Sequence, residues 1–425
     1  MENTNPNVAA DAPKGPLAFL IASLVFLCLS AVWLAWNPSL LMDPKIGPES
    51  IAWIYVSVYG FALSGVFGLV YRAVPLIFGV TLYNTQFVML HLVFHLIGLL
   101  LLLPIAFSPD WQLGMMGQSF LACGAVVFIV NIAGSFKRED RPDAAAAFVA
   151  TSMLWLGLML VVGIPFAKNP LIGFFSDTSW SPATLALCIT GVVLNAMFGL
   201  ALRITAMRLG STMGRTNTPW FALAFVNSGA AWLFAALAFG PAPFVLLCAV
   251  VYFVGVLVYI ARFTSILQSR ENDSLEWDSK ILYTGLWMIP VGVVMFGFAV
   301  WNRSITKDAP IQLEAACLLT MMLGACVPAI VALIFQTLSL QRGDESGADA
   351  PLDVRLSAQI LLAAFFNYAV GVLMIVPGAW LGIEKMRALG TLFLIVGTLG
   401  FLGNFLYMLR MKSPKTSAAR LAQSA

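Results

Sequence analysis

The chain carries little charge for its length. Asp, Glu, Lys and Arg make up 10% of its 425 residues, whereas hydrophobic residues make up 60%. An average soluble domain contains about 25% charged residues. Water is therefore not the solvent for most of this surface, and a lipid bilayer is the expected partner.

Side chains that usually carry chemistry are also scarce. The six cysteines form no CxxC and no recognisable metal pattern, so we expect ordinary buried thiols. Acidic residues are almost absent from the apolar stretches, which disfavours a proton-coupled pump because such a pump needs a protonatable carboxylate at depth. Only two histidines are present, His91 and His95.

Long apolar runs fill the sequence instead. Residues 16–36 and 86–107, for example, reach the roughly 20 residues with which a helix crosses ~30 Å of hydrocarbon. Hydropathy and helix-breaking residues predict an all-α, polytopic membrane protein of twelve transmembrane helices, forming a single transmembrane domain over residues 1–425. The expected spans are 16–36, 51–80, 86–107, 112–136, 144–166, 182–209, 218–239, 241–266, 281–301, 311–338, 354–380 and 386–410.

The distribution of basic residues predicts the orientation. With the N-terminus inside, 17 of the 23 lysines and arginines fall on the inner side. This positive-inside bias places both termini in the cytoplasm of a bacterial inner (cytoplasmic) membrane. The net charge of +3 then reflects topology, and no nucleic-acid partner is expected.

One internal repeat links the second and sixth expected spans. Five residues recur at a constant spacing of 131 residues, Phe67, Gly68, Leu69, Arg72 and Gly79 corresponding to Phe198, Gly199, Leu200, Arg203 and Gly210. Four spans per repeat would divide twelve spans into three equal groups, but residues 321–336 of the tenth span show no convincing third copy. Two roles are open for Arg72 and Arg203: snorkelling toward the inner face, or binding an anion such as a haem propionate.

The two histidines stand one turn apart on one face of the third span. That spacing suits one small metal ion, although the intervening residues are apolar and no Glu follows the first His as in an HExxH helix. It cannot supply both axial ligands of one haem, because these approach from opposite faces. Two roles stay open for His91 and His95: an interhelical hydrogen bond, or ligation of a metal or a haem by at least one imidazole.

Two adjacent methionine pairs offer soft sulfur donors of the kind that suits copper, Met115/Met116 and Met321/Met322. Eighteen methionines in so apolar a chain make adjacent pairs expected without any metal. We therefore expect both pairs to be ordinary apolar side chains.

The second and third spans resemble the haem-copper oxidase subunit I superfamily, especially the C-family oxidases and their shorter NnrS-family relatives. The shared features are Gly60-Phe61, a Tyr-x-x-x-Pro from Tyr71 to Pro75, Gly79 at the helix end, and an LHxxxxxIG that begins at Leu90. A second patch, LRITAMRLGSTMGRTNTP, is similar to an Arg-rich turn of the NnrS family. The resemblance implies a fold of three pseudo-symmetric arcs of four helices.

The departures from that pattern bear on function. In this superfamily a histidine five residues before the Gly-Phe pair ligates the low-spin haem, and here that position is Tyr55. No histidine follows His95, so the other haem ligands and the three-histidine copper site have no counterpart. If the chain shares the fold, it has lost most haem and copper ligands, and cytochrome c oxidase activity is not expected from this chain alone.

We therefore expect an oxidase-like or NnrS-like inner-membrane protein without a complete oxidase site. Its expected context is respiration, nitric-oxide stress, or haem or copper handling, with a respiratory-chain or redox subunit as partner. Two alternatives remain: a secondary transporter or channel that uses the cavity between helix arcs, and a membrane cytochrome with a single haem b on His91 or His95 and Tyr55 as second ligand. Haem b and copper are the candidate cofactors.

Overall fold

A computed structural model describes residues 14–42, 47–106, 111–137, 143–166, 180–211, 216–270, 275–306, 311–342 and 352–411. Within these ranges every regular element is helical, so the expected all-α class is confirmed. The elements are α1 Lys14–Trp36, α2 Pro48–Ile54, η2 Tyr55–Leu63, α3 Ser64–Ile77, α4 Thr85–Leu102, η3 Leu103–Ala106, α5 Trp111–Phe136, α6 Ala144–Phe166, α8 Trp180–Ala186, η4 Leu187–Val193, α9 Leu194–Arg208, α10 Thr218–Phe239, α11 Ala242–Gln268, α12 Trp277–Thr306, α13 Ile311–Leu319, η5 Thr320–Cys326, α14 Val327–Arg342, α15 Leu352–Trp380 and α16 Glu384–Arg410. The outermost ends of the expected domain, 1–13 and 412–425, lie outside the described residues.

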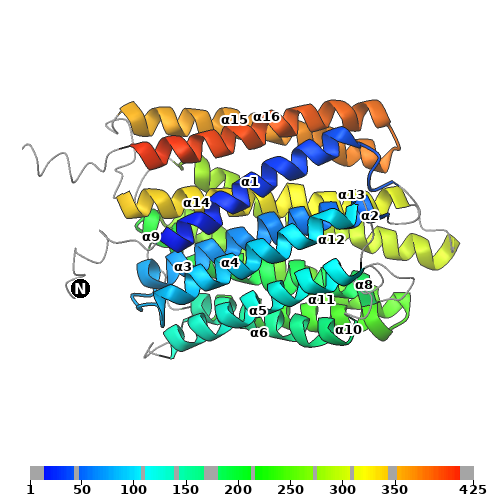
Figure 1. Ribbon diagram of the computed structural model, residues 1–425, viewed down its shortest axis with the longest axis horizontal. Helices are drawn as coiled ribbons and strands as arrows, with labels where there is room; N and C mark the ends of the chain where they lie inside the picture. Colours follow the sequence, from blue (N-terminus) through cyan, green and yellow to red (C-terminus); the bar gives the residue numbers. More distant parts are fainter. Residues whose placement is uncertain are drawn as a thin grey trace, which may run out of the picture.

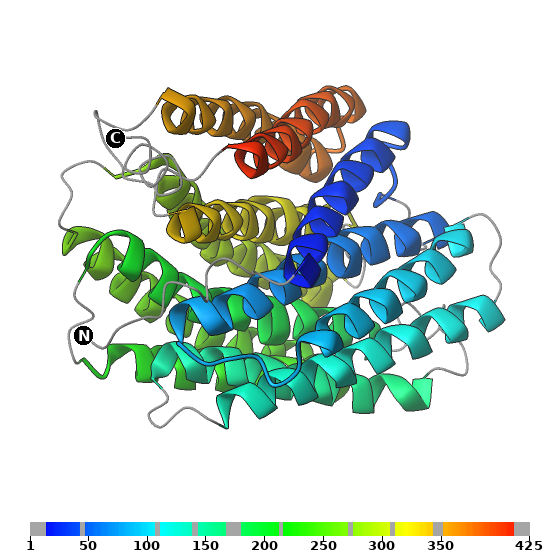
Figure 2. The ribbon, with the colours of Figure 1, turned by 60° about the vertical axis from the view of Figure 1, so that its left-hand side comes forward.

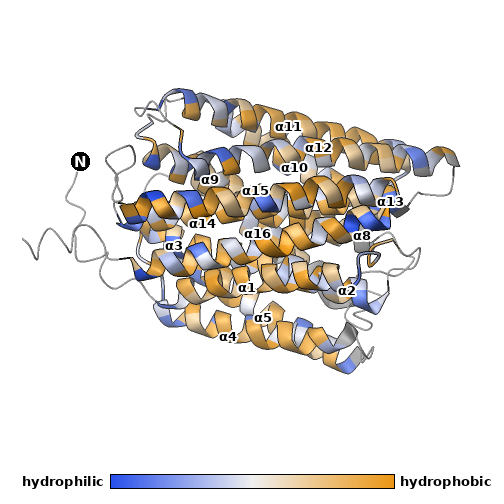
Figure 3. Cartoon of the chain, turned by 90° about the horizontal axis from the view of Figure 1, so that it is seen from above, coloured by the Kyte–Doolittle hydropathy of each residue, from blue (hydrophilic) through white to orange (hydrophobic). Residues whose placement is uncertain are grey.

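The helices are built to cross a membrane. In the described part of the chain, 11 helices are long and apolar enough to do so, and α6 adds a shorter apolar helix over Ala144–Leu160. Apolar residues cover the lengths of the helices while polar residues gather toward their two ends (Figure 3). The chain is therefore a multi-pass membrane protein surrounded by lipid, and the count of twelve spans stays a prediction.

Three of the spanning helices are almost wholly enclosed by the others. Pro48–Ile77, Ala183–Arg208 and Gln312–Arg342 are 100%, 89% and 94% buried over their most apolar windows, whereas α1, the next most buried, reaches 50%. Their C-terminal halves, α3, α9 and α14, contact one another in pairs. We call these three helices the central helices (Figure 1).

Each central helix changes its winding partway along. The π-helical segments η2, η4 and η5 interrupt them, and each contains a glycine: Gly60, Gly191 and Gly324. Carbonyls of a π segment accept from the N–H five residues on, and where α and π winding meet a carbonyl can be left without an intrahelical donor. In a membrane core these carbonyls need other hydrogen-bond donors.

The π segments reveal a third copy of the repeat that the residues alone did not disclose. Gly191 and Leu200 of the second copy recur at a spacing of 133 residues as Gly324 and Leu333, and Gln336 takes the place of Arg203. Val331 and Ala332 replace the Phe-Gly pair, which hides the match. The next position in the series, Gly343, lies outside the described residues.

The remaining helices pack around the central helices in chain order. Around the first central helix pack α1, α4 and α5; around the second pack α6, α10 and α11; around the third pack α12, α15 and α16. Neighbouring groups meet where α5 contacts α6, α11 contacts α12 and α16 contacts α1. Seen from a second direction, α15 and α16 form one edge of the molecule and α5 and α6 lie near the opposite edge (Figure 2).

Candidate functional site beside the first central helix

The histidine pair faces the first central helix. Both side chains lie on the buried face of α4, with 0% of His91 and 2% of His95 exposed. Their ring centroids are 5.8 Å apart. Neither imidazole faces lipid. This agrees with the free-energy cost of placing an unpaired polar ring in hydrocarbon.

His95 binds the backbone of the π segment η2. Its Nε2 lies 3.1 Å from the carbonyl oxygen of Tyr59 and 2.9 Å from Oγ of Ser64. Because a carbonyl only accepts, we assign the proton to Nε2, which then donates. Ser64 Oγ also donates to the Tyr59 carbonyl at 3.3 Å. His95 thus satisfies a carbonyl at the point where the central helix changes its winding.

His91 sits in an aromatic enclosure. Its Nδ1 is 3.1 Å from the hydroxyl of Tyr71. The rings of Phe19 and Phe67 approach to centroid distances of 4.7 and 4.6 Å, and Phe128 lies at 5.5 Å. The buried Nε2 has no hydrogen-bond partner among the described residues. Its immediate surroundings are therefore ring faces and edges.

The other two π segments are stabilised in the same way by other residue types. Asn195 Nδ2 donates to the Gly191 carbonyl at 2.9 Å, and the Tyr368 hydroxyl donates to the Leu323 carbonyl at 2.7 Å. In the first π segment, Ser23 Oγ of α1 also donates to the Phe61 carbonyl at 2.9 Å. The sequence analysis did not predict roles for Asn195, Tyr368 and Ser23. Their polar side chains within apolar helices are the feature that could have indicated such roles.

Tyr55 forms a hydrogen bond with a residue of α5 and not with the histidine pair. Its side chain is 3% exposed, and its hydroxyl accepts a hydrogen bond of 2.9 Å from Nε2 of Gln118 on α5. Its ring lies 5.4 Å from that of Tyr59, one turn further along η2. The structure therefore gives the hydroxyl of Tyr55 a side-chain partner on another helix.

Side chains also fill the space next to η2 on its α1 side. A Cβ added to Gly60 would lie 2.7 Å from Cγ of Phe26, so the phenyl ring rests directly on the glycine. A Cβ on Gly65 would lie 2.7 Å from Ile330 of α14, which brings the first and third central helices into contact. Even a methyl group at either glycine would require a neighbouring side chain to shift.

All three candidate ligands already form hydrogen bonds within the protein. The Nε2 of His95 is used by the Tyr59 carbonyl, and the hydroxyl of Tyr55 is used by Gln118. Across the described ranges, no three His, Cys, Asp or Glu side chains come together as metal ligands would.

The two repeat arginines are held by protein partners. Arg72 Nε donates to Oε1 of Gln341 on α14 at 2.6 Å. Arg203 forms an ion pair with Asp143 and lies over the ring of Phe78, 5.4 Å from its centroid. Both therefore tie a central helix to a neighbouring segment.

A further ionic cluster lies near the same end of the second central helix. Arg208 pairs with Glu276, and Asp278 lies 3.2 Å away. The sequence reading did not single out this cluster.

The comparison with known proteins supports the fold alone. No protein-family model and no curated protein matches the chain. Among solved structures, it is similar to a haem-copper terminal oxidase that was solved as a dimer by cryo-EM, with a TM-score of 0.65 over 97% of this chain and 85% of that chain. Sequence identity over this match is 10%. The chain therefore shares the fold of a haem-copper terminal oxidase.

Proposed function

We propose that the chain is an oxidase-fold protein of a bacterial inner membrane that does not carry out oxidase chemistry itself. In this proposal the positions that hold cofactors in oxidases are closed by its own side chains. It serves respiration, nitric-oxide stress defence, or haem or copper handling through a respiratory-chain or redox partner subunit. Membership of the NnrS-like group is part of the same proposal.

The hydrogen bond from His95 to the Tyr59 carbonyl is the observation that supports this best. The Nε2 of His95 could act as a ligand only by giving up its hydrogen bond to the Tyr59 carbonyl. The pair formed by Phe26 and Gly60 adds a steric reason. A structural role for His95 therefore agrees with its surroundings better than ligation does.

The proposed architecture is twelve transmembrane helices in three pseudo-symmetric arcs of four. Three central helices with a π segment each, and three outer helices packed around every one, support it. The second and sixth spans are expected to superpose after rotation by a third of a turn about the membrane normal. Both termini are expected in the cytoplasm, and reporter fusions after Arg270 and after Arg342 test this, because an outside signal at either would break the span count.

The test of the function is an absorption spectrum of the protein purified from cells supplied with haem and copper. We expect no Soret band at a stoichiometric level. A stoichiometric band that disappears in His91→Gln or His95→Gln, with unchanged expression, would instead establish the single-haem cytochrome. Tyr55→Phe is the matched variant for the second ligand that this alternative needs.

A secondary transporter or channel is the second candidate. Interrupted helices with freed carbonyls at mid-depth are a common feature of ion and substrate sites in transporters, and η2, η4 and η5 are such interruptions. Side chains already cap carbonyls in all three. Ion flux into vesicles that contain the purified protein, absent from protein-free vesicles, would favour this candidate over the scaffold.

A further inference from the structure

Sulfur-bearing side chains gather where α12 packs against the third central helix. On α12, Met288, Gly292 and Met295 follow at spacings of four and three residues, so they share one helix face. On α13 and η5, Cys317 and Met321 are four residues apart and face α12. We call this contact the sulfur seam.

The contacts within the sulfur seam centre on two glycines. Sγ of Cys317 donates to the carbonyl of Gly292 at 3.4 Å, and Sδ of Met321 packs directly on the same glycine. Met288 packs on the facing glycine, with its Cε 3.0 Å from where a Cβ on Gly324 would be. Sδ of Met295 accepts a hydrogen bond of 3.3 Å from Oγ1 of Thr320, the neighbour of Met321.

Gap filling alone accounts for methionines in many cores, but here the seam also holds a thiol. Cys317, Met295 and Met321 are each less than a tenth exposed. The polar atoms that the seam offers are thioethers, one thiol, one hydroxyl and one carbonyl. No imidazole or carboxylate forms a hydrogen bond in these contacts, and Glu314 lies one turn before Cys317 on α13. This donor set suits a soft ion such as Cu(I), and it is poor for Mg²⁺, Ca²⁺ or Mn²⁺.

Charge selects among soft ions. A Cu(I) ion together with one thiolate and two thioethers carries no net charge, whereas a divalent ion on the same three ligands leaves a positive charge that hydrocarbon penalises. Binding requires only that the Cys317 thiol releases its proton as the copper–sulfur bond forms, and no electron is transferred. The three rotatable bonds of each methionine allow the thioethers to turn toward the ion.

We propose that the sulfur seam binds Cu(I), with Cys317, Met295 and Met321 as ligands. The proposal does not rest on the proposed function, because this seam is separate from the histidine pair and uses different donors. A Soret band in the purified protein would overturn the proposed function and leave the Cu(I) titration unaffected.

The experiment is an anaerobic titration of the purified full-length protein with Cu(I), in competition with the chromogenic chelator bathocuproine disulfonate. We expect the wild type to retain one equivalent, and C317S to lose affinity by at least about tenfold. M321L and M295L preserve side-chain volume and should each weaken binding, so they decide the outcome if C317S does not yield folded protein. Elution on size exclusion checks that every variant is folded.

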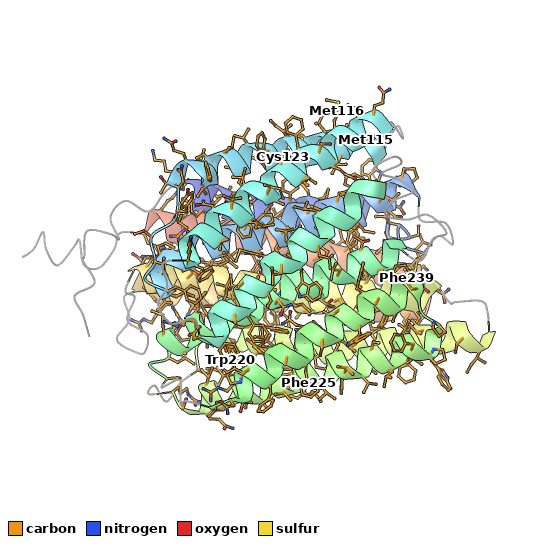
Figure 4. The ribbon with its side chains drawn as sticks, turned by 90° about the horizontal axis from the view of Figure 1, so that it is seen from below. Met115, Met116, Cys123, Trp220, Phe225 and Phe239 are labelled. Atoms are coloured by element: carbon orange, nitrogen blue, oxygen red, sulfur yellow. The ribbon has the colours of Figure 1, made fainter. Side chains whose placement is uncertain are left out.

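The matched control is the double variant M115L/M116L. These methionines lie on α5 at the edge of the molecule, well away from α12, and Met116 is 52% exposed (Figure 4). The double variant should bind Cu(I) as the wild type does. No retained Cu(I) in the wild type, or equal retention by the wild type and all three seam variants, would overturn the proposal.

Discussion

At the scale of single residues, the two histidines differ although they are neighbours on one helix face. The Nε2 of His95 has two polar partners, whereas the Nε2 of His91 has none among the described residues. Helical spacing predicts that both point inward, because it fixes direction along the helix. Helical spacing does not indicate which carbonyl or ring each imidazole contacts, because these groups belong to helices that are distant in the sequence.

Removing His95 should destabilise the protein. His95→Leu leaves the Tyr59 carbonyl with fewer donors in an apolar interior, which costs about 1–3 kcal/mol of unfolding free energy. His95→Gln keeps an N–H donor and should lose less. Denaturant unfolding in detergent measures the difference, and equal stability of the wild type and His95→Leu would contradict the role assigned to this imidazole.

His91 should be the more replaceable of the two. In the double variant His91→Phe with Tyr71→Phe, both partners of one hydrogen bond become apolar, which costs little, and only the contact of the Tyr71 hydroxyl with Asn131 is lost besides. Tyr71→Phe alone removes one partner and should cost more. The same unfolding assay compares them, and a double variant less stable than the sum of its single changes would show that His91 does more than fill the aromatic enclosure.

At the scale of helices, hydropathy identifies the apolar runs but not how they wind. A π segment has the same composition as the α-helix around it, so η2, η4 and η5 leave no mark in a sequence that is apolar throughout. The repeat between the second and sixth spans was visible because Phe, Gly, Leu and Arg are identical there. The third copy keeps too few of these residues to be recognised without its backbone.

Close packing at the first π segment should be sensitive to volume. Gly60→Ala places a methyl group 2.7 Å from the Phe26 ring, so the ring must shift. We expect a loss of about 1–3 kcal/mol from overpacking. Adding Phe26→Leu should restore part of this loss, because the smaller side chain yields the space. An additive double variant would mean that the ring does not rest on Gly60.

The capping of the third π segment allows a parallel test. Tyr368→Phe keeps the ring and removes only the hydroxyl that donates to the Leu323 carbonyl. The expected loss is about 1–3 kcal/mol. Tyr283→Phe, on a partly exposed ring whose hydroxyl meets Thr264, is the control and should change stability less. Equal losses of stability in Tyr368→Phe and Tyr283→Phe would contradict a particular stabilising role of the Tyr368 hydroxyl at the π segment.

At the scale of the whole molecule, the sequence was informative about the solvent and much less so about the cofactors. Composition predicted the membrane, and short motifs pointed to the oxidase fold that the structural comparison supports. No histidine follows His95, and for this reason a histidine-ligated oxidase site is not expected from the sequence. Only the packed structure shows what surrounds the candidate ligands His95 and Tyr55, because Phe26, Gln118 and Ser64 are ordinary residues that become informative through the groups they contact.

The most direct measurement is a cryo-EM map of the protein purified from cells supplied with haem and copper, at a resolution that separates side chains around η2. We predict the Phe26 ring against Gly60 and Nε2 of His95 within hydrogen-bonding distance of the Tyr59 carbonyl. Planar density between α1 and η2, or an ion bound to the Nε2 of His95, would contradict the proposal that side chains have closed the cofactor positions.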